Sequence, residues 1–189
     1  MIRNPNDILK YLDENIEYGW VGDNGIKRVN NMDNFRLHYR ILSNKNAIKY
    51  GVGTCIEQVS IMKELLDNLG IESKMYSTRI YEDESFNDLN KKERMHCFIL
   101  YFIDGRTYQL EHPNPDERGI HEYKNEEDAI RYLEDYYENM TKEEYIEKGI
   151  KFNEEDIKRK TTEFYEAKEG LTFKEFNLYL NSLDKKKIK

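Results

Sequence analysis

Two side chains of this 189-residue sequence, Cys55 and His96, are of the types that serve as a nucleophile and a base. Cys55 follows Gly-Val-Gly-Thr and begins a segment with helical apolar spacing. The first turn of a helix presents free N–H groups and about half a positive charge, which stabilise a thiolate and can hold an oxyanion. Gly51 and Gly53 would let a substrate backbone approach closely. A reactive thiolate is therefore one interpretation of Cys55, and a small buried residue at a helix start is the other.

A predicted β-hairpin brings a carboxylate to His96. Two apolar runs, 95–103 and 106–110, flank the Asp-Gly pair that type I′ turns favour. In the register that this turn sets, the side chains of His96, Phe98 and Glu111 project from one face. His96 and Glu111 become diagonal neighbours, about 7–8 Å apart at Cα, which allows a carboxylate–imidazole hydrogen bond. The alternatives are a satisfied core histidine and a solvated glutamate at a strand end.

Cys55, His96 and Glu111 together would form an activated nucleophile. An imidazole that is held by a carboxylate keeps one tautomer and accepts protons near neutral pH. The three residues lie far apart in the sequence, so the fold must bring the start of a helix to the end of a hairpin.

The first half of the chain predicts two helices with an irregular segment between them. Apolar spacing predicts a helix over residues 5–18 and another from residue 54 to about residue 69. Thr54 is the expected N-cap of the second helix, and Gly70 is expected to end it from the C′ position. Residues 19–50 carry repeated Gly and Asn signals and are expected to be irregular.

The second half predicts a small antiparallel sheet followed by helices, and therefore an α+β fold. Residues 75–81 have the pattern of a strand, and residues 82–94 form a polar connection. Beyond Pro115 the pattern is helical, with one helix from Asn125 to about residue 139 and further helices behind two expected capping boxes, Thr141 with Glu144 and Thr172 with Glu175. The expected division is a core over residues 1–122 and a helical extension over residues 123–189 that packs on it.

The order of these motifs resembles the transglutaminase-like superfamily of papain-like cysteine enzymes. The resemblance lies in G-V-G-T-C-I-E-Q-V-S-I-M-K-E-L-L-D-N-L-G-I, then H-C-F, then Y-Q-L-E-H-P, and covers about residues 50–115. It implies a papain-like core in which the helix that bears the cysteine packs on a small antiparallel sheet. By this resemblance Cys55 matches the nucleophile, His96 the general base and Glu111 the third member. Cys97-Phe98 stands where Ala-Trp is frequent, and Glu111 stands where Asp is usual.

The resemblance implies thiol acyl transfer that needs no cofactor. The Cys55 thiolate would attack an amide or ester carbonyl of a peptide or protein substrate, and the acyl-enzyme would pass to water or to an amine. Hydrolysis is the leading expectation, and an acyltransferase with a thioester donor would use the same set. A different class of function is also open, in which the set is inactive and the Tyr-rich C-terminal helices bind a protein partner.

Two further residues are candidates for contact with a substrate. By analogy with the superfamily, the indole of Trp20 is a candidate second oxyanion donor, and the alternative is that Trp20 anchors the 19–50 segment onto the core. Gln58 lies one helical turn after Cys55 on the same side of the helix and could donate to a substrate. The alternative for Gln58 is a solvated residue on the helix surface.

A second nucleophile and a metal site are disfavoured. Cys97 faces His112 on the other side of the hairpin, but it lacks a helix dipole, and its apolar neighbours should raise its pKa. A zinc site is disfavoured because strand alternation prevents one face from supplying three ligands. The residues considered for zinc are His96, Cys97, Glu111, His112 and His121.

Composition restricts the partners. Lys plus Arg number 30 and Asp plus Glu number 37, so the net charge is −7, which disfavours binding to nucleic acid or to an anionic membrane. No apolar run approaches the ~18–20 residues of a membrane span, and a signal-peptide-like stretch is absent. With two cysteines and no disulfide pattern, we expect a cytoplasmic protein. The pattern favours no particular oligomeric state or substrate.

Overall fold

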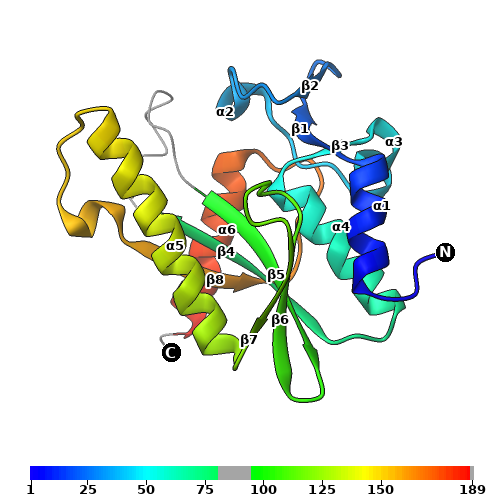
Figure 1. Ribbon diagram of the computed structural model, residues 1–189. Helices are drawn as coiled ribbons and strands as arrows, with labels where there is room; N and C mark the ends of the chain where they lie inside the picture. The colour runs from blue at the N-terminus through cyan, green and yellow to red at the C-terminus, as the bar shows by residue number, and fades with distance from the viewer. Residues whose placement is uncertain (81–94, 188–189) are drawn as a thin grey trace.

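The computed structural model describes residues 1–80 and 95–187, and these residues form an α+β fold, as predicted. The helices are α1 (Pro5–Asn15), α2 (Phe35–His38), α3 (Asn44–Tyr50), α4 (Cys55–Asn68), α5 (Glu126–Glu147), the 3₁₀ helix η2 (Glu154–Ile157) and α6 (Phe173–Lys187). The strands are β1 (Glu17–Val21), β2 (Lys27–Val29), β3 (Val52–Gly53), β4 (Ser73–Ile80), β5 (Met95–Ile103), β6 (Arg106–Glu111), β7 (Gly119–Tyr123) and β8 (Arg159–Phe164). Figure 1 shows their arrangement.

A five-stranded antiparallel sheet forms the centre of the molecule, in the order β7-β6-β5-β4-β8. The predicted hairpin is confirmed: Ile103 pairs with Arg106, and the register holds along the strands to the pair of Ile99 with Leu110. Asp104 and Gly105 both have positive φ, 53° and 75°, as a type I′ turn requires. The turn therefore sets which residues of β5 and β6 share a face.

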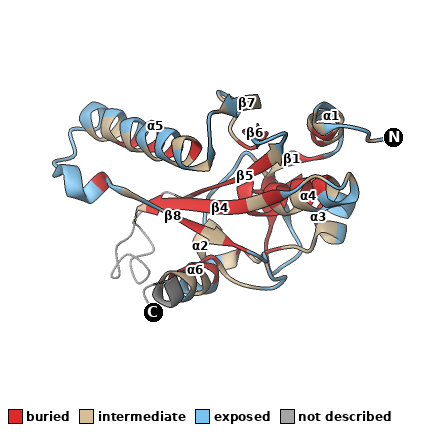
Figure 2. Ribbon diagram, turned by 90° about the horizontal axis from the view of Figure 1, so that it is seen from below, coloured by how far each residue is buried: buried red, intermediate tan, exposed pale blue. Residues whose placement is uncertain are grey.

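The two faces of the sheet pack against different helices. On one face, Cys97, Ile99 and Tyr101 of β5 join a large apolar core with residues of α1, α4 and α6. On the other face, Phe98 and Leu100 join a smaller cluster with α5. Strand alternation explains this division, because successive side chains point to opposite faces. Figure 2 shows α5 and α6 on opposite sides of the sheet.

The segment before α4 is more regular than the sequence predicts. The predicted irregular span 19–50 contains most of β1, together with β2, α2 and α3. β1 pairs antiparallel with β2 and parallel with β3, which makes a small mixed sheet. In the parallel pair Tyr18 lies opposite Gly53, two residues before Cys55. This pairing brings β1 to the start of α4.

The expectation of a purely helical C-terminal extension is wrong. β8 pairs antiparallel with β4 at the edge of the main sheet, and β7 pairs with β6. Thr141 does not begin a new helix but lies within α5, where its hydroxyl donates to the carbonyl of Tyr137. The caps expected at Asn125 and Thr172 are present. The predicted polar connection over 82–94 lies outside the described residues.

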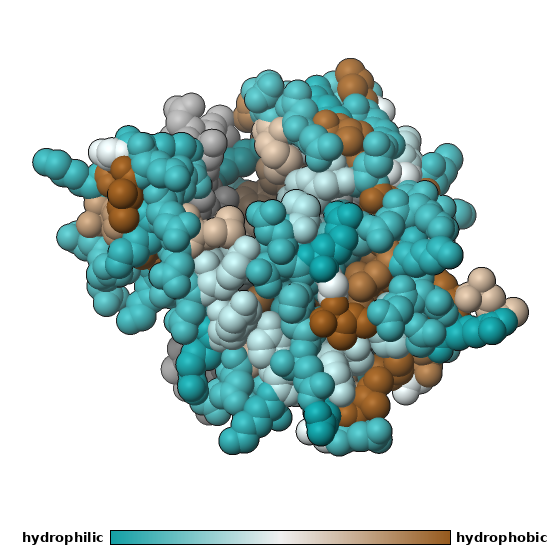
Figure 3. Space-filling model, viewed as in Figure 1, coloured by the Kyte–Doolittle hydropathy of each residue, from teal (hydrophilic) through white to brown (hydrophobic). Residues whose placement is uncertain are grey.

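The surface carries scattered apolar side chains among many charged ones. Figure 3 shows hydrophilic residues over most of one face, with apolar residues in small groups. Single exposed apolar residues of this kind are common on globular proteins. In the described part of the chain, no helix has the length and apolar character needed to cross a membrane.

Candidate active site

Cys55 is the first residue of α4, and the start of this helix is tightly anchored. Thr54 is the N-cap, as predicted: its hydroxyl accepts from the N–H of Ile56, and its own N–H donates to Glu57. A Cβ on Gly53 would lie 2.9 Å from the Cβ of Glu57, so close packing of β3 on α4 requires glycine there. Gly51 ends α3 at φ +63°. Gly51 and Gly53 therefore have structural roles in the turn after α3 and in the packing of β3 on α4. The sequence had suggested only that they let a substrate approach the backbone.

His96 and Glu111 are joined by the hydrogen bond that the hairpin predicts, with 2.9 Å between His96 Nε2 and Glu111 Oε2. Glu111 is fully buried. Its Oε2 also accepts from the side chain of Gln109 at 2.9 Å, and its Oε1 accepts from the N–H of Asn114 at 2.9 Å. Three donors therefore hold the carboxylate in place, and Nδ1 is the imidazole nitrogen left to face a reacting group.

The pKa values of the Cys55 thiol and the His96 imidazole favour a thiolate–imidazolium pair at neutral pH. A hydrogen bond from the Cys97 thiol, followed by a hydrogen bond with His96 and its charge, lowers the pKa of Cys55 to about 5 although burial opposes this. Burial also opposes the charged form of His96, but the charge of Glu111 and hydrogen bonds with Cys55 and Glu111 raise its pKa to about 10. Between these two values Cys55 is a thiolate and His96 an imidazolium.

The surroundings of Cys97 disfavour its ionisation. Its side chain is fully buried, and burial, together with the hydrogen bond and charge of Cys55, raises its pKa well above the usual range. His112, its expected partner, has both ring nitrogens occupied, Nδ1 by Gln58 at 2.6 Å and Nε2 by Asp13 at 3.0 Å. The Cys97 thiol therefore remains protonated and donates to the Cys55 sulfur.

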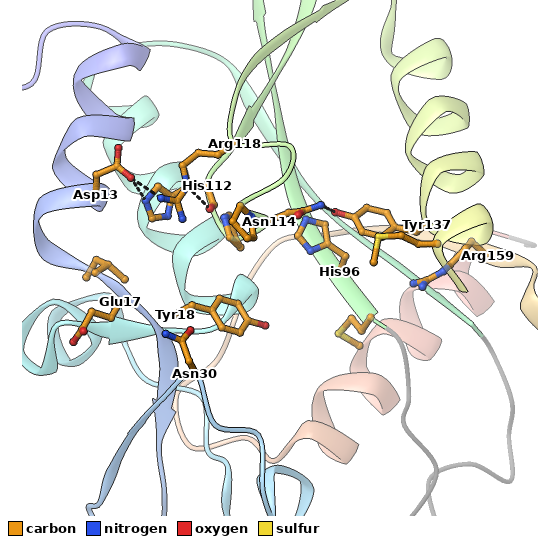
Figure 4. Close-up of a pocket in the computed structure, with 15 residues that line it drawn as sticks. Asp13, Glu17, Tyr18, Asn30, His96, His112, Asn114, Arg118, Tyr137 and Arg159 are labelled. Atoms are coloured by element: carbon orange, nitrogen blue, oxygen red, sulfur yellow. Dashed lines mark hydrogen bonds and ion pairs between the residues drawn. The ribbon is translucent and has the colours of Figure 1, made fainter. Parts of the chain in front are cut away.

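A cavity of about 660 Å³ adjoins His96. Its walls come from α1 and β1, from the 112–118 segment after β6, and from α5 and the start of β8, as Figure 4 shows. The ring of Tyr137 packs on the imidazole of His96, with 4.7 Å between the ring centroids and 31° between the planes. Cys55 does not line the cavity, but it is 7% exposed and interacts with His96, which does line it.

Trp20 and Gln58 are not placed to contact a substrate. The indole N–H of Trp20 donates to the carbonyl of Asn31 at 2.7 Å, and the ring is 1% exposed, so Trp20 anchors the segment that contains β1 and β2. Gln58 is fully buried rather than on the helix surface. Its amide donates to the carbonyl of Gly53 and accepts from His112, which ties α4 to the end of β6.

Three residues of the site were not found from the sequence. Gln109 holds the carboxylate of Glu111, Tyr137 covers the His96 ring, and Tyr18 lines the cavity from β1. Gln109 was detectable, because it lies two residues before Glu111 on the same strand face. Tyr18 and Tyr137 had no local signal, because their positions depend on pairing and packing between distant segments.

Within residues 1–80 and 95–187, no three His, Cys, Asp or Glu side chains are grouped in a way that could hold a metal ion. What the arrangement offers instead is a buried thiolate, a charged imidazole that can return a proton, and a carboxylate that fixes the imidazole. Together these groups are chemically suited to nucleophilic attack on a carbonyl carbon. When it is compared with protein-family models, with curated proteins and with solved structures, the sequence matches none of them.

Proposed function

We propose that the protein is a cysteine-dependent acyl-transfer enzyme that most readily hydrolyses an amide or ester bond, with Cys55, His96 and Glu111 as its catalytic set. We further propose that the helix α4 and the sheet form a papain-like, transglutaminase-like core. The observation that carries the proposal is the His96 imidazole held at 2.9 Å from a fully buried Glu111, with Cys55 at the first residue of α4. The lowered pKa of Cys55 supports it.

The proposed reaction has two steps. The Cys55 thiolate attacks the carbonyl carbon, the C–S bond forms, and the carbonyl π electrons move to the oxygen. When the tetrahedral intermediate collapses, the bond to the leaving group breaks and the leaving group takes a proton from the His96 imidazolium. His96, now neutral, then removes a proton from water as the water oxygen attacks the thioester carbon. The C–S bond breaks, the acid is released, and Cys55 is again a thiolate beside the His96 imidazolium. An amine in place of water would give transfer instead of hydrolysis.

The first experiment tests for an acyl-enzyme at Cys55. The purified protein is mixed with p-nitrophenyl acetate, a small activated ester, and p-nitrophenolate release is followed. We expect a burst, with an acetyl group on Cys55 in peptide mass mapping. Cys55→Ala should abolish the burst, and Ser60→Ala, on the same helix and outside the cavity lining, should retain it. Turnover that survives in Cys55→Ala would refute the assignment.

The same protein distinguishes the enzyme from an inactive scaffold. At pH 6 the Cys55 thiolate should react with iodoacetamide much faster than free cysteine, because the thiolate is the reactive form and the pKa of Cys55 is about 5. Alkylation no faster than that of free cysteine would favour the scaffold that binds a protein partner.

A further inference from the structure

We propose that Tyr18 is a catalytic residue of this site, whose hydroxyl donates a hydrogen bond to the oxyanion that forms when the Cys55 thiolate attacks a carbonyl. The inference rests on the proposed function. The backbone N–H of Cys55, at the start of α4, is the natural first donor. Tyr18 would be the second, in the role that the sequence assigned to Trp20.

The register of the small sheet places Tyr18 beside the nucleophile. β1 and β3 pair in parallel, with Tyr18 opposite Gly53, and Gly53 precedes the N-cap Thr54. Gly53 packs tightly on the first turn of α4, where a side chain at position 53 would collide with Glu57. This contact fixes the position of β3 relative to the start of α4. Tyr18 is therefore carried on a strand whose position relative to Cys55 is set by backbone pairing.

The hydroxyl of Tyr18 is available to a substrate. Tyr18 is half-buried and lines the cavity, and Figure 4 shows its side chain extending from β1 into the cavity. Among the residues that the structure describes, its hydroxyl has no hydrogen-bond partner. A polar group that faces a cavity without a partner is a candidate contact for a bound molecule. The hydroxyls of Tyr39 and Tyr76, in contrast, both donate to carboxylates.

The electrostatic surroundings keep this hydroxyl protonated. Burial raises the pKa of Tyr18, and the negative charges of Cys55, Glu57 and Glu111 raise it further. A phenol that stays protonated throughout the working pH range can donate to an oxyanion but cannot compete with His96 as a base.

The proposed role adds no proton transfer to the reaction. When the C–S bond forms, the carbonyl oxygen gains the π electron pair, and the O–H of Tyr18 donates to it while keeping its proton. When the intermediate collapses, the pair returns to form the C=O bond of the thioester and the hydrogen bond weakens. The leaving group still receives its proton from His96. Tyr18 would thus stabilise the transition state more than the bound ester.

Two electrophiles distinguish this role from support of the thiolate. p-Nitrophenyl acetate reacts through an oxyanion, whereas iodoacetamide is displaced at a tetrahedral carbon and forms none. In Tyr18→Phe we expect the acylation rate of Cys55 to fall on the order of 10²-fold, with iodoacetamide alkylation changed by less than about twofold. Tyr108→Phe is the matched control, because Tyr108 is also half-buried but packs against Tyr101, outside the cavity lining.

The outcomes test the role of Tyr18 and the proposed function of the protein separately. Equal loss of both rates, or no loss of either, would overturn the role of Tyr18. A similar selective loss in Asn30→Ala but not in Tyr18→Phe would move the role to Asn30, which also lines the cavity. If wild-type Cys55 is neither acylated nor rapidly alkylated, the proposed function itself fails.

Discussion

At the scale of single residues, the length of Glu111 decides how the site is built. A glutamate side chain is one methylene longer than that of aspartate. Glu111 reaches His96 Nε2 from the end of β6, and Gln109 and the N–H of Asn114 hold its two oxygens. The longer side chain has one more rotatable bond. The two donors Gln109 and Asn114 N–H compensate for this freedom by holding the carboxylate in one position.

Glu111→Gln should raise the pKa of Cys55. The neutral amide removes the charge that raises the pKa of His96, so the imidazolium weakens and stabilises the thiolate less. The hydrogen bond from Cys97 remains, so the midpoint of the pH–rate profile for iodoacetamide should rise above about 5 but stay below that of free cysteine. Acyl transfer should fall about 10²–10⁴-fold, because the base loses its orientation. An unchanged profile would contradict this, and Glu122→Gln on exposed β7 is the control.

The local placement of Cys55, His96 and Glu111, the proposed catalytic set, was predictable from the sequence because each part follows a local rule. The Asp104-Gly105 turn sets the register that brings His96 and Glu111 together, and Thr54 marks the start of the helix that carries Cys55. No local rule specifies that the helix start and the hairpin end meet in space; this was inferred from the chemistry of the three residue types and from the resemblance. Tyr18 could not be assigned, because its place depends on a parallel pairing across 34 intervening residues that no turn specifies.

At the scale of elements, one buried carboxylate holds the start of α4. Glu57 is 1% exposed and accepts from the hydroxyl of Tyr39 at 2.7 Å, from the N–H of Leu42 at 3.1 Å, and from both the N–H and the hydroxyl of Thr54. The donors come from the segment before α3 and from the N-cap. Glu57 thus links the segment between α2 and α3 to the helix α4, which positions Cys55.

Tyr39→Phe should destabilise the fold by about 1–3 kcal/mol, because it removes a donor from a buried carboxylate and leaves that oxygen with fewer partners. The measurement is the free energy of unfolding in urea. Tyr50→Phe is the matched control, because Tyr50 is 40% exposed, and it should change the free energy by less than about 0.5 kcal/mol. Equal effects of the two substitutions would show that Glu57 does not carry the anchoring.

The elements that the sequence missed are short or lie at sheet edges. β8 has the residues R-K-T-T-E-F, of which only Thr162 and Phe164 are buried, so two inward side chains are its whole strand signal. β2 and β3 have three and two residues. Such segments become strands because a neighbour offers a free edge, and this is tertiary information that local propensity does not contain. The long, strongly periodic helices α1 and α4 were predicted within a few residues.

At the scale of the whole molecule, the cavity is lined by residues from both the N-terminal and the C-terminal parts of the chain. Asp13 of α1 accepts from Arg118 at 2.9 Å and contacts His112 at 3.0 Å, so α1 is tied to the segment after β6. On the opposite wall Tyr137 and Arg159 come from the C-terminal part. This part is therefore integral to the site, and a core limited to residues 1–122 would lack one wall of the cavity.

The pKa shifts of Cys55 and His96 predict how the free energy of unfolding depends on pH. The folded pKa of Cys55, about 5, lies below its ordinary value of 9.0, so its contribution is complete above pH 9 and is lost as the pH falls towards 5. The folded pKa of His96, about 10, lies above 6.5, so its contribution is complete below pH 6.5 and is lost as the pH rises towards 10. The opposite slopes cancel between pH 6.5 and 9, which predicts a plateau.

Stability should therefore fall on both sides of this plateau. The lowered pKa of His112 adds to the loss on the acid side, and the raised pKa of Cys97 adds to the loss on the alkaline side. The measurement is the free energy of unfolding in urea from pH 4.5 to 10. In Cys55→Ala the opposing Cys55 slope is lost while Glu111 still raises the pKa of His96, so stability should decline from about pH 6.5 upwards, whereas Ser60→Ala should retain the plateau. A plateau that persists in Cys55→Ala would mean that the thiolate and the imidazolium are not paired in the folded protein.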